Sequence, residues 1–384
     1  MKKIFALMLG SLALLGATSC SDSDNNEPDV VNEKEVALQK VAAPYVNNTV
    51  LPTYKGMADA AINLYDAVEQ MQAKHANGSL ATADISKAAD AWKESRRYWE
   101  LSEAFLFGPA ADYNIDPHID SWPLDKDAMD RLLVDIRSGK ELSLDNNFGY
   151  GLLGFHSIEY MLYELSADGN SSQIHSTNYT PEELAYLMMV AEDLRNQCVC
   201  LEACWAGTEN VTSAKQSILN DADLDKGQNY GAMMINAGQP GSIFKTYQAV
   251  AEEIIQGCID IADEVGNTKI GRPNSASSTE DRNYIESPYS LNSIEDFQDN
   301  IRSIQNSYIG SKSGDASISD YIKSRNPQLD TKLRTAIDNS IKAIAAIPEP
   351  FTKSATGAEA SNAVKVVGTD LVDVLTEVYN ELLK

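Results

Sequence analysis

The sequence predicts an all-α protein built from two helical bundles. Apolar residues recur every three or four positions through most of the chain, whereas the two-residue alternation typical of a strand is scarce. The chain has 384 residues and is 43% hydrophobic, which is enough for two domains with sizeable cores. The number of predicted helices also suits two bundles rather than one.

The first half of the chain holds five predicted helices. We expect helices at 55–74, 84–107, 126–136 and 149–165, and Gly108 with Pro109 should end the second of them. A fifth begins at Thr180-Pro181-Glu182-Glu183, which supplies an N-cap, a proline at the first helical position and an acidic first turn, and it should reach Trp205.

The remaining helices follow, one of them before and the others after a glycine-rich break. They are predicted at 211–223, 242–265, 293–307, 318–324, 329–347 and 358–383. The breaks at 225–239 and 266–288 are rich in glycine, proline or serine. We therefore divide the folded chain into an N-terminal bundle at 36–225 and a C-terminal bundle at 226–384.

The first twenty residues have the pattern of an export signal. Two lysines precede an apolar run at 4–15, and Ala17-Thr18-Ser19 leads directly into Cys20. This resembles a bacterial lipobox, so we expect a lipid anchor on Cys20. Residues 21–35 should be a disordered acidic tether, and its start resembles the export tag of surface lipoproteins in Bacteroides-like bacteria. The predicted location is the outer membrane of the cell envelope, with exposure at the cell surface or in the periplasm left open.

Charge and cysteine content limit which ligands and metal sites the protein can have. The 56 acidic side chains outnumber the 31 basic ones, which disfavours nucleic acid and favours cations. We expect the four cysteines of the folded chain to be buried free thiols, or to include one disulfide bridge to Cys258 from Cys198, Cys200 or Cys204. A bridge between Cys200 and Cys204 is disfavoured, because an i, i+4 pair on a helix has poor disulfide geometry. Their spacing does not fit a zinc site.

The sharpest motif lies at 149–163. His156 and Glu159 are three residues apart, so on a helix both side chains point the same way and can bind one ion. Gly154 has no side chain and lets another backbone segment approach. Chance pairs of this spacing are frequent, but the apolar flanks indicate a buried helix, where an unpaired carboxylate is costly.

Gly154-x-His156-x-x-Glu159 resembles the signature of the imelysin family of exported bacterial proteins. The stretches at 92–109, 114–123 and 287–297 are similar to that family as well. The resemblance implies two packed α-helical bundles with a functional cleft at their interface. It also implies a link to iron uptake, and a peptidase activity after which the family was first described.

Other residues are candidates for the same site. Glu100 and Asp116 are predicted to join His156 and Glu159 as metal ligands, the metal being iron, zinc or manganese. The predicted ligand-binding wall consists of Gly154, Glu103, His118, Asp120, Ser287, Tyr289 and Ser290. Ion pairs of Glu100 and Glu103 with Arg96 and Arg97, and a turn role for Asp116, are the structural alternatives.

Three functions remain open. The leading one is an envelope lipoprotein that binds a metal ion, iron above all, or a small polar ligand. A zinc peptidase is the second, but the positions that need a Glu and a second His hold Ser157 and Tyr160. The third is a metal-free module whose cleft binds a peptide or an envelope protein.

Overall fold

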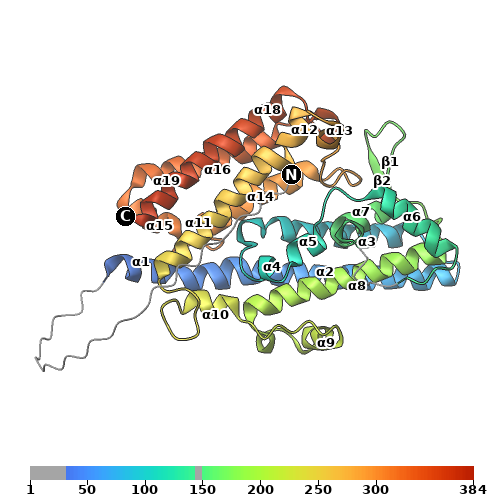
Figure 1. Cartoon of the computed structure of the whole chain (residues 1–384), viewed down its shortest axis with the longest axis horizontal. Coiled ribbons are helices and arrows are strands. Elements are labelled where there is room, and N and C mark those ends of the chain that lie inside the picture. The colour runs from blue at the N-terminus through green and yellow to red at the C-terminus, as the bar shows by residue number, and fades with distance from the viewer. Residues whose placement is uncertain (1–31, 143–148) are drawn as a thin grey trace, which may run out of the picture.

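A computed structural model of the chain describes residues 32–142 and 149–384. Most of these residues are helical, which confirms the all-α prediction (Figure 1). The predicted signal peptide, Cys20 and most of the predicted tether lie outside the described residues. Within the two described ranges, no helix is both long enough and apolar enough to cross a membrane.

The first layer of the fold is made by the long helices α2, α3 and α8, which pack side by side (Figure 1). In chain order the helical elements of this part are α1 (Glu33–Pro44), η1 (Tyr45–Val50), α2 (Leu51–Ala76), α3 (Thr82–Glu100), η2 (Glu103–Phe105), α4 (Pro109–Asp112), α5 (Ile115–Ile119), α6 (Lys126–Arg137), η3 (Tyr150–Leu152), α7 (Gly154–Leu162), α8 (Pro181–Ala206), η4 (Thr208–Asn210) and α9 (Ser213–Asp221).

The second layer is made by α11, α14, α16 and α19 (Figure 1). In chain order the remaining elements are α10 (Tyr230–Ile235), which packs against α8 of the first layer, and then α11 (Tyr247–Asp263), η5 (Glu264–Lys269), α12 (Gly271–Ser275), α13 (Thr279–Arg282), α14 (Ser293–Ile309), α15 (Ile318–Arg325), α16 (Pro327–Ala345), α17 (Phe351–Ser354), α18 (Ala358–Lys365), η6 (Val366–Leu371) and α19 (Val372–Leu383). The layers meet where α3 and η2 contact α14 and where η2 contacts α11. The boundary between residues 225 and 226 stays a prediction.

Several predicted helices are shorter than the sequence indicated: the one expected at 242–265 begins at Tyr247 and the one at 211–223 spans Ser213–Asp221, and two others end in a different structure. The helix expected at 84–107 ends at Glu100, and the chain turns through η2 instead, with the Ser102 hydroxyl donating to the Trp99 carbonyl. The helix expected at 149–165 is limited to α7. Its predicted C-terminal residues form the strand β1 (Tyr163–Leu165), which pairs antiparallel with β2 (Ser172–Ile174). The sequence carries no signal for this hairpin, because three-residue strands are too short to show alternation.

The predicted tether is also too long at its C-terminal end. Residues 33–35 form the first turn of α1, which Asn32 caps by accepting a hydrogen bond from the Glu35 N–H. The Glu35 carboxylate in turn accepts the N–H groups of Tyr247 and Gln248, at 2.7 and 3.0 Å. These N–H groups lie at the start of α11, where a helix has unpaired donors and a positive dipole end. This contact orders the segment.

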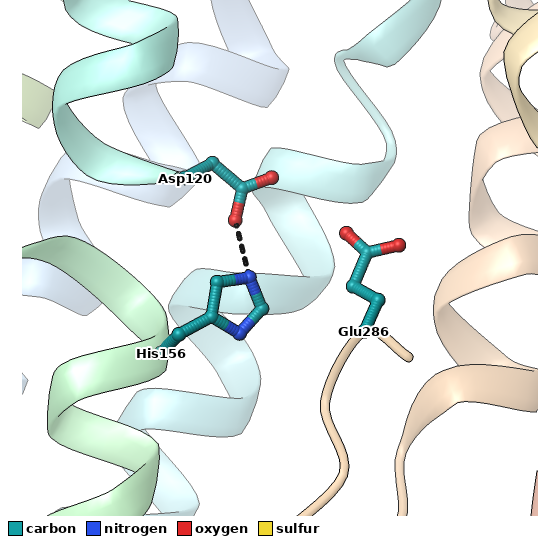
Figure 2. Close-up of side chains that lie close together, drawn as sticks. All are labelled: Asp120, His156 and Glu286. Atoms are coloured by element: carbon teal, nitrogen blue, oxygen red, sulfur yellow. Dashed lines mark ion pairs between the residues drawn. The ribbon is translucent and has the colours of Figure 1, made fainter. Parts of the chain in front are cut away.

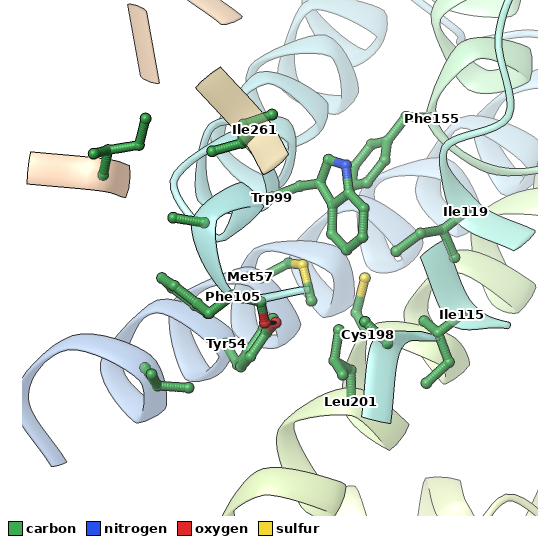
Figure 3. Close-up of a cluster of buried hydrophobic side chains, with 14 of the residues drawn as sticks. Tyr54, Met57, Trp99, Phe105, Ile115, Ile119, Phe155, Cys198, Leu201 and Ile261 are labelled. Carbon is green, nitrogen blue, oxygen red and sulfur yellow. Dashed lines mark hydrogen bonds between the residues drawn. The ribbon is translucent and has the colours of Figure 1, made fainter. Parts of the chain in front are cut away.

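The hydrophobic core reaches directly under the residues of the predicted site. Trp99 is fully buried beside Ile119 and Phe155, with Cys198 close by (Figure 3). Ile119 and Phe155 immediately precede Asp120 and His156 in the chain. Because these apolar side chains are fixed by close packing, the polar residues next to them are held in defined positions.

Candidate metal centre

Helix α7 begins at Gly154 because only glycine fits there. Its φ angle is +70°, and a Cβ atom at this position would lie 1.9 Å from the carbonyl oxygen of Ile119. The backbone approach predicted for Gly154 is therefore present, and it brings the start of α7 against the end of α5. Asp120 follows α5 directly, so this contact sets Asp120 beside His156.

His156 lies between two carboxylates. Its Nε2 atom is 3.1 Å from Oδ1 of Asp120, and its Nδ1 atom is 3.6 Å from Oε2 of Glu159. Figure 2 shows the imidazole and the Asp120 carboxylate pointing toward each other, with the Glu286 carboxylate facing them from a different segment. Burial lowers the pKa of His156, but the neighbouring carboxylates of Asp120 and Glu159 outweigh it and raise the pKa to about 9.

Asp120 is held as a carboxylate by its neighbours. Its Oδ2 atom accepts a hydrogen bond of 2.7 Å from the Trp99 indole, and its Oδ1 atom is paired with Arg96. Burial on its own would raise the pKa of Asp120, yet the charges of Arg96 and His156 hold it well below the ordinary value. Asp120 therefore presents a charged oxygen to the centre.

Arg96 is the fully buried cation around which the acidic groups gather. Its guanidinium pairs with Glu100, Asp120 and Glu286, and it lies 5.3 Å from the ring centre of Phe155. Burial acts against the charged form, but these carboxylates raise the pKa of Arg96 above its ordinary value. The predicted ion-pair alternative is thus confirmed for Glu100 and Arg96.

A second buried cation enters from the other layer. Lys269, the last residue of the π-helix η5, places Nζ 3.1 Å from Oε1 of Glu286 and 3.3 Å from Oε1 of Glu103. Glu103 therefore pairs with Lys269, and no contact of Glu103 with Arg96 or Arg97 is found among the described residues. A hydrogen bond from Asn300 of α14 also reaches Glu100.

Glu159 ties α7 to the segment before α14. Its Oε1 atom accepts hydrogen bonds from the backbone N–H of Tyr289 at 3.0 Å, and from the N–H and hydroxyl of Ser290, both at 2.7 Å. Two residues before Tyr289 in the same segment, Ser287 donates to Asp296 at 2.6 Å. Three predicted wall residues thus contact acidic groups at the centre.

Carboxylates outnumber cations in this charged cluster even with His156 protonated. Its acidic members are Glu100, Glu103, Asp120, Glu159, Glu286 and Asp296, and its basic members are Arg96, His156 and Lys269. All are buried. Burial raises the pKa of Glu100 and Glu103 well above the ordinary value, and that of Asp296 to about 6. The excess negative charge must be balanced by protons or by a bound cation.

Two overlapping sets of side chains in the cluster can each surround one ion. The first is Asp120, His156 and Glu286, and the second is Glu100, Glu103 and Asp120. Each set can offer one ligand atom per residue with all three atoms within 4.8 Å of one another. In the first set, Oε2 of Glu286 is buried and has no hydrogen-bond partner within the described part of the chain.

Not every predicted site residue reaches the cluster. His118 instead pairs with Asp193 of α8 at 2.8 Å and lies against the ring of Tyr150. Asp116 is half-buried, and burial followed by the charge of Asp120 raises its pKa to about 7. Among the described residues, neither one belongs to a set of side chains that could surround an ion, and Gly154 contributes packing rather than a contact group.

Sequence reasoning assigned no site role to Arg96, Lys269, Glu286 or Asp296. Glu286 directly precedes the predicted residue Ser287, so its position in the sequence could have identified it as a site residue. Asp296 lies in the stretch that resembles the family. Lys269 gave no signal at all, because its inward direction depends on the π-helical turn of η5.

Comparison with known proteins agrees with this architecture. The profile of the imelysin family matches residues 50–378. The chain is 25% identical over 342 residues to iron-regulated protein A of Synechococcus elongatus, covering 88% of this chain and 84% of that protein.

Two solved structures are similar over nearly the whole chain. One is an iron-regulated protein A precursor from Parabacteroides distasonis, with a TM-score of 0.76, 29% identity, and coverage of 91% of this chain and 95% of that one. An imelysin-like protein from Psychrobacter arcticum shares the fold, with a TM-score of 0.58, 16% identity, and coverage of 91% and 93%. Since the family profile spans most of its length, the chain belongs to the imelysin family.

Proposed function

We propose that the charged cluster binds one divalent metal ion, iron in the cell, through His156, Asp120 and Glu286. The observation that carries this proposal is the convergence of these three buried side chains from separate segments, with one oxygen of Glu286 lacking a partner among the described residues. A donor set of one imidazole and two carboxylates suits Fe²⁺, Mn²⁺ or Zn²⁺. The iron-regulated relatives favour iron among them.

Glu159 has a different role in this proposal from the direct ligand that the sequence suggested. One of its oxygens is occupied by Tyr289 and Ser290, while the other faces Nδ1 of His156. A carboxylate behind a ligating histidine orients the ring and increases its basicity. We therefore assign Glu159 to positioning His156 and the Tyr289–Ser290 segment.

We further propose that an ion approaches the cluster past Tyr289. Tyr289 donates its backbone N–H to Glu159, and its side chain lines a cavity of about 470 Å³ together with Tyr160, His175 and Asp130. Movement of the Tyr289 segment would connect this cavity to the buried centre. The same cavity has room for the small polar ligand that the sequence analysis left open.

Cellular placement forms part of the proposal. The small residues before Cys20 and the acidic segment after it support a lipoprotein anchored in the outer membrane, with a role in iron acquisition. Mass spectrometry of the protein from the membrane fraction tests the anchor, because a lipid on Cys20 changes the mass of the N-terminal peptide and a Cys20→Ala variant lacks it.

Metal content tests the central proposal. Purified protein is dialysed against Fe²⁺, Mn²⁺ or Zn²⁺ without oxygen and then freed of unbound metal, and the ion content per chain is measured by elemental analysis. We expect one ion in the wild type and none in His156→Ala. The matched control is His118→Ala, which removes an imidazole that pairs with Asp193 outside the cluster and should leave metal content unchanged.

The same measurement separates the other functions. A folded wild-type protein that binds no metal would eliminate the metal centre and leave a peptide-binding or protein-binding module. Metal-dependent cleavage of peptides, lost in His156→Ala, would instead establish the peptidase.

A further inference from the structure

Lys269 is a cation buried among carboxylates at one side of the charged cluster. Its side chain is 1% exposed, and Nζ lies 3.1 Å from Glu286, 3.3 Å from Glu103 and 3.7 Å from Glu100. The side chain is therefore an ammonium group surrounded by carboxylate oxygen atoms.

These oxygens belong to the second set of side chains that can surround an ion. That set consists of Glu100, Glu103 and Asp120, and it shares Asp120 with the His156 set. The Lys269 ammonium contacts two of its three members. The Lys269 ammonium thus occupies the position where the second set could otherwise bind a metal cation from solution.

We propose that Lys269 fills a second cation position and limits the centre to one metal ion. The inference rests on the proposed function, since the first ion is the one bound by His156, Asp120 and Glu286. Without the ammonium, Glu100, Glu103 and a bridging Asp120 form an all-oxygen site suited to Mn²⁺ or Fe²⁺. The ammonium opposes a second dication by occupying its space and by repelling its charge at short range.

The backbone keeps Lys269 in this place. It ends η5, and η5 packs against η6 through Gly266 and Gly368. A Cβ atom on Gly266 would lie 2.2 Å from the Cα atom of Gly368, so the two π-helical segments are in direct backbone contact. This contact fixes η5, and it therefore holds the Lys269 ammonium in place among the carboxylates of the cluster.

Manganese content and electron paramagnetic resonance test the inference on the whole protein. We expect the wild type to hold one Mn²⁺ with the spectrum of an isolated ion. Lys269→Met should hold two ions, a twofold increase, with a spectrum broadened by exchange coupling because Asp120 bridges them. Lys269→Gln is measured in parallel, since its amide can still donate to Glu103 and preserve folding where methionine does not.

Two control variants test whether the change in ion content depends on the positive charge at Lys269. Lys215 is an equally buried lysine that pairs with Glu202 and Asp59 away from the cluster, so Lys215→Met should keep one ion. The double variant Lys269→Met/Glu103→Gln removes one positive and one negative charge together. It should return the content to one ion.

The outcomes are distinct. One ion in both folded Lys269 variants, or two in the wild type, overturns the role of Lys269 while leaving the metal centre intact. No ion in the wild type or in any variant overturns the proposed function and this inference with it. No ion in the wild type but one in the Lys269 variants rejects the proposed function and supports Lys269 as the resident cation.

Discussion

Glu159 and Ser290 are joined by two hydrogen bonds to a single carboxylate oxygen. The backbone N–H and the hydroxyl of Ser290 each donate to Oε1 of Glu159 at 2.7 Å, although the two residues are 131 positions apart in the chain. The other oxygen of Glu159 faces His156. The acidic position of the family signature therefore connects the layers of the fold and positions the histidine at the same time.

This arrangement predicts different outcomes for two substitutions of Glu159. Glu159→Gln keeps an acceptor oxygen for Tyr289 and Ser290, so the free energy of unfolding should fall by only about 1 kcal/mol. Glu159→Ala leaves three donors without their partner and should lower it by roughly 3 kcal/mol or more. Urea denaturation of metal-free protein measures both.

Metal affinity should respond to Glu159→Gln as well. Loss of the negative charge behind His156 should weaken binding by about 10-fold to 100-fold without abolishing it. Isothermal titration calorimetry measures this change. Complete loss of binding in a folded Glu159→Gln protein would show that Glu159 is itself a ligand, as the sequence suggested.

His156 should make the stability of the metal-free protein depend on pH in the alkaline range. Its pKa is about 9 in the folded protein and 6.5 in the reference state. The protonated ring therefore contributes its full stabilisation below pH 6.5, and this is lost as the pH rises through 9. The pKa difference corresponds to about 3 kcal/mol.

The measurement compares wild type with His156→Gln by urea denaturation at pH 6 and at pH 10. The stability difference between them should shrink by about 3 kcal/mol at the higher pH. A difference that stays constant over this range would mean that His156 is not charged in the folded state.

Asp116 should make stability depend on pH with the same sign, but in the acidic range. Its pKa is raised from 3.8 to about 7, so the folded protein holds a proton that the unfolded chain releases above pH 4. Stability is consequently lost as the pH rises from 4 to 7, by at most about 4 kcal/mol. Asp116→Asn removes this titration.

We expect Asp116→Asn to be more stable than the wild type at pH 8 and to lose this advantage toward pH 4. Thermal unfolding followed by circular dichroism across this range checks the trend. A wild type that is the more stable protein at pH 8 would indicate that the Asp116 carboxylate has a stabilising partner when charged.

Gly154 should tolerate no side chain. Alanine there would adopt φ +70° and place Cβ 1.9 Å from the Ile119 carbonyl oxygen, so α7 or α5 must shift. We expect Gly154→Ala to lower the free energy of unfolding by more than about 3 kcal/mol and to reduce metal binding. Denaturation and elemental analysis measure the two effects.

Gly78 provides the matched control. It has a similar φ angle of +74°, but no atom lies within 4 Å of the position that a Cβ would take, so Gly78→Ala bears the backbone cost alone. That cost is about 1 to 2 kcal/mol. Equal effects of the two substitutions would mean that the contact between Gly154 and Ile119 carries no energy.

Local signals in the sequence were sufficient for most helices. Helix α8 begins where Thr180, Pro181 and Glu183 indicated, with the Thr180 hydroxyl accepting the Glu183 N–H and the Glu183 carboxylate accepting the Thr180 N–H. Such capping involves only neighbours in the chain. The shared direction of His156 and Glu159, and the close approach at Gly154, were equally local and could be predicted.

The sequence by itself therefore determined the helical class, the start of α8 and the pairing of His156 with Glu159, because each depends on residues a few positions apart. Only the tertiary structure decided that Arg96, Glu286 and Lys269 complete the centre. These residues come from α3, a loop and a π-helix, and no periodicity links them. Their convergence results from packing between the layers, where buried charges must find partners far away in the chain.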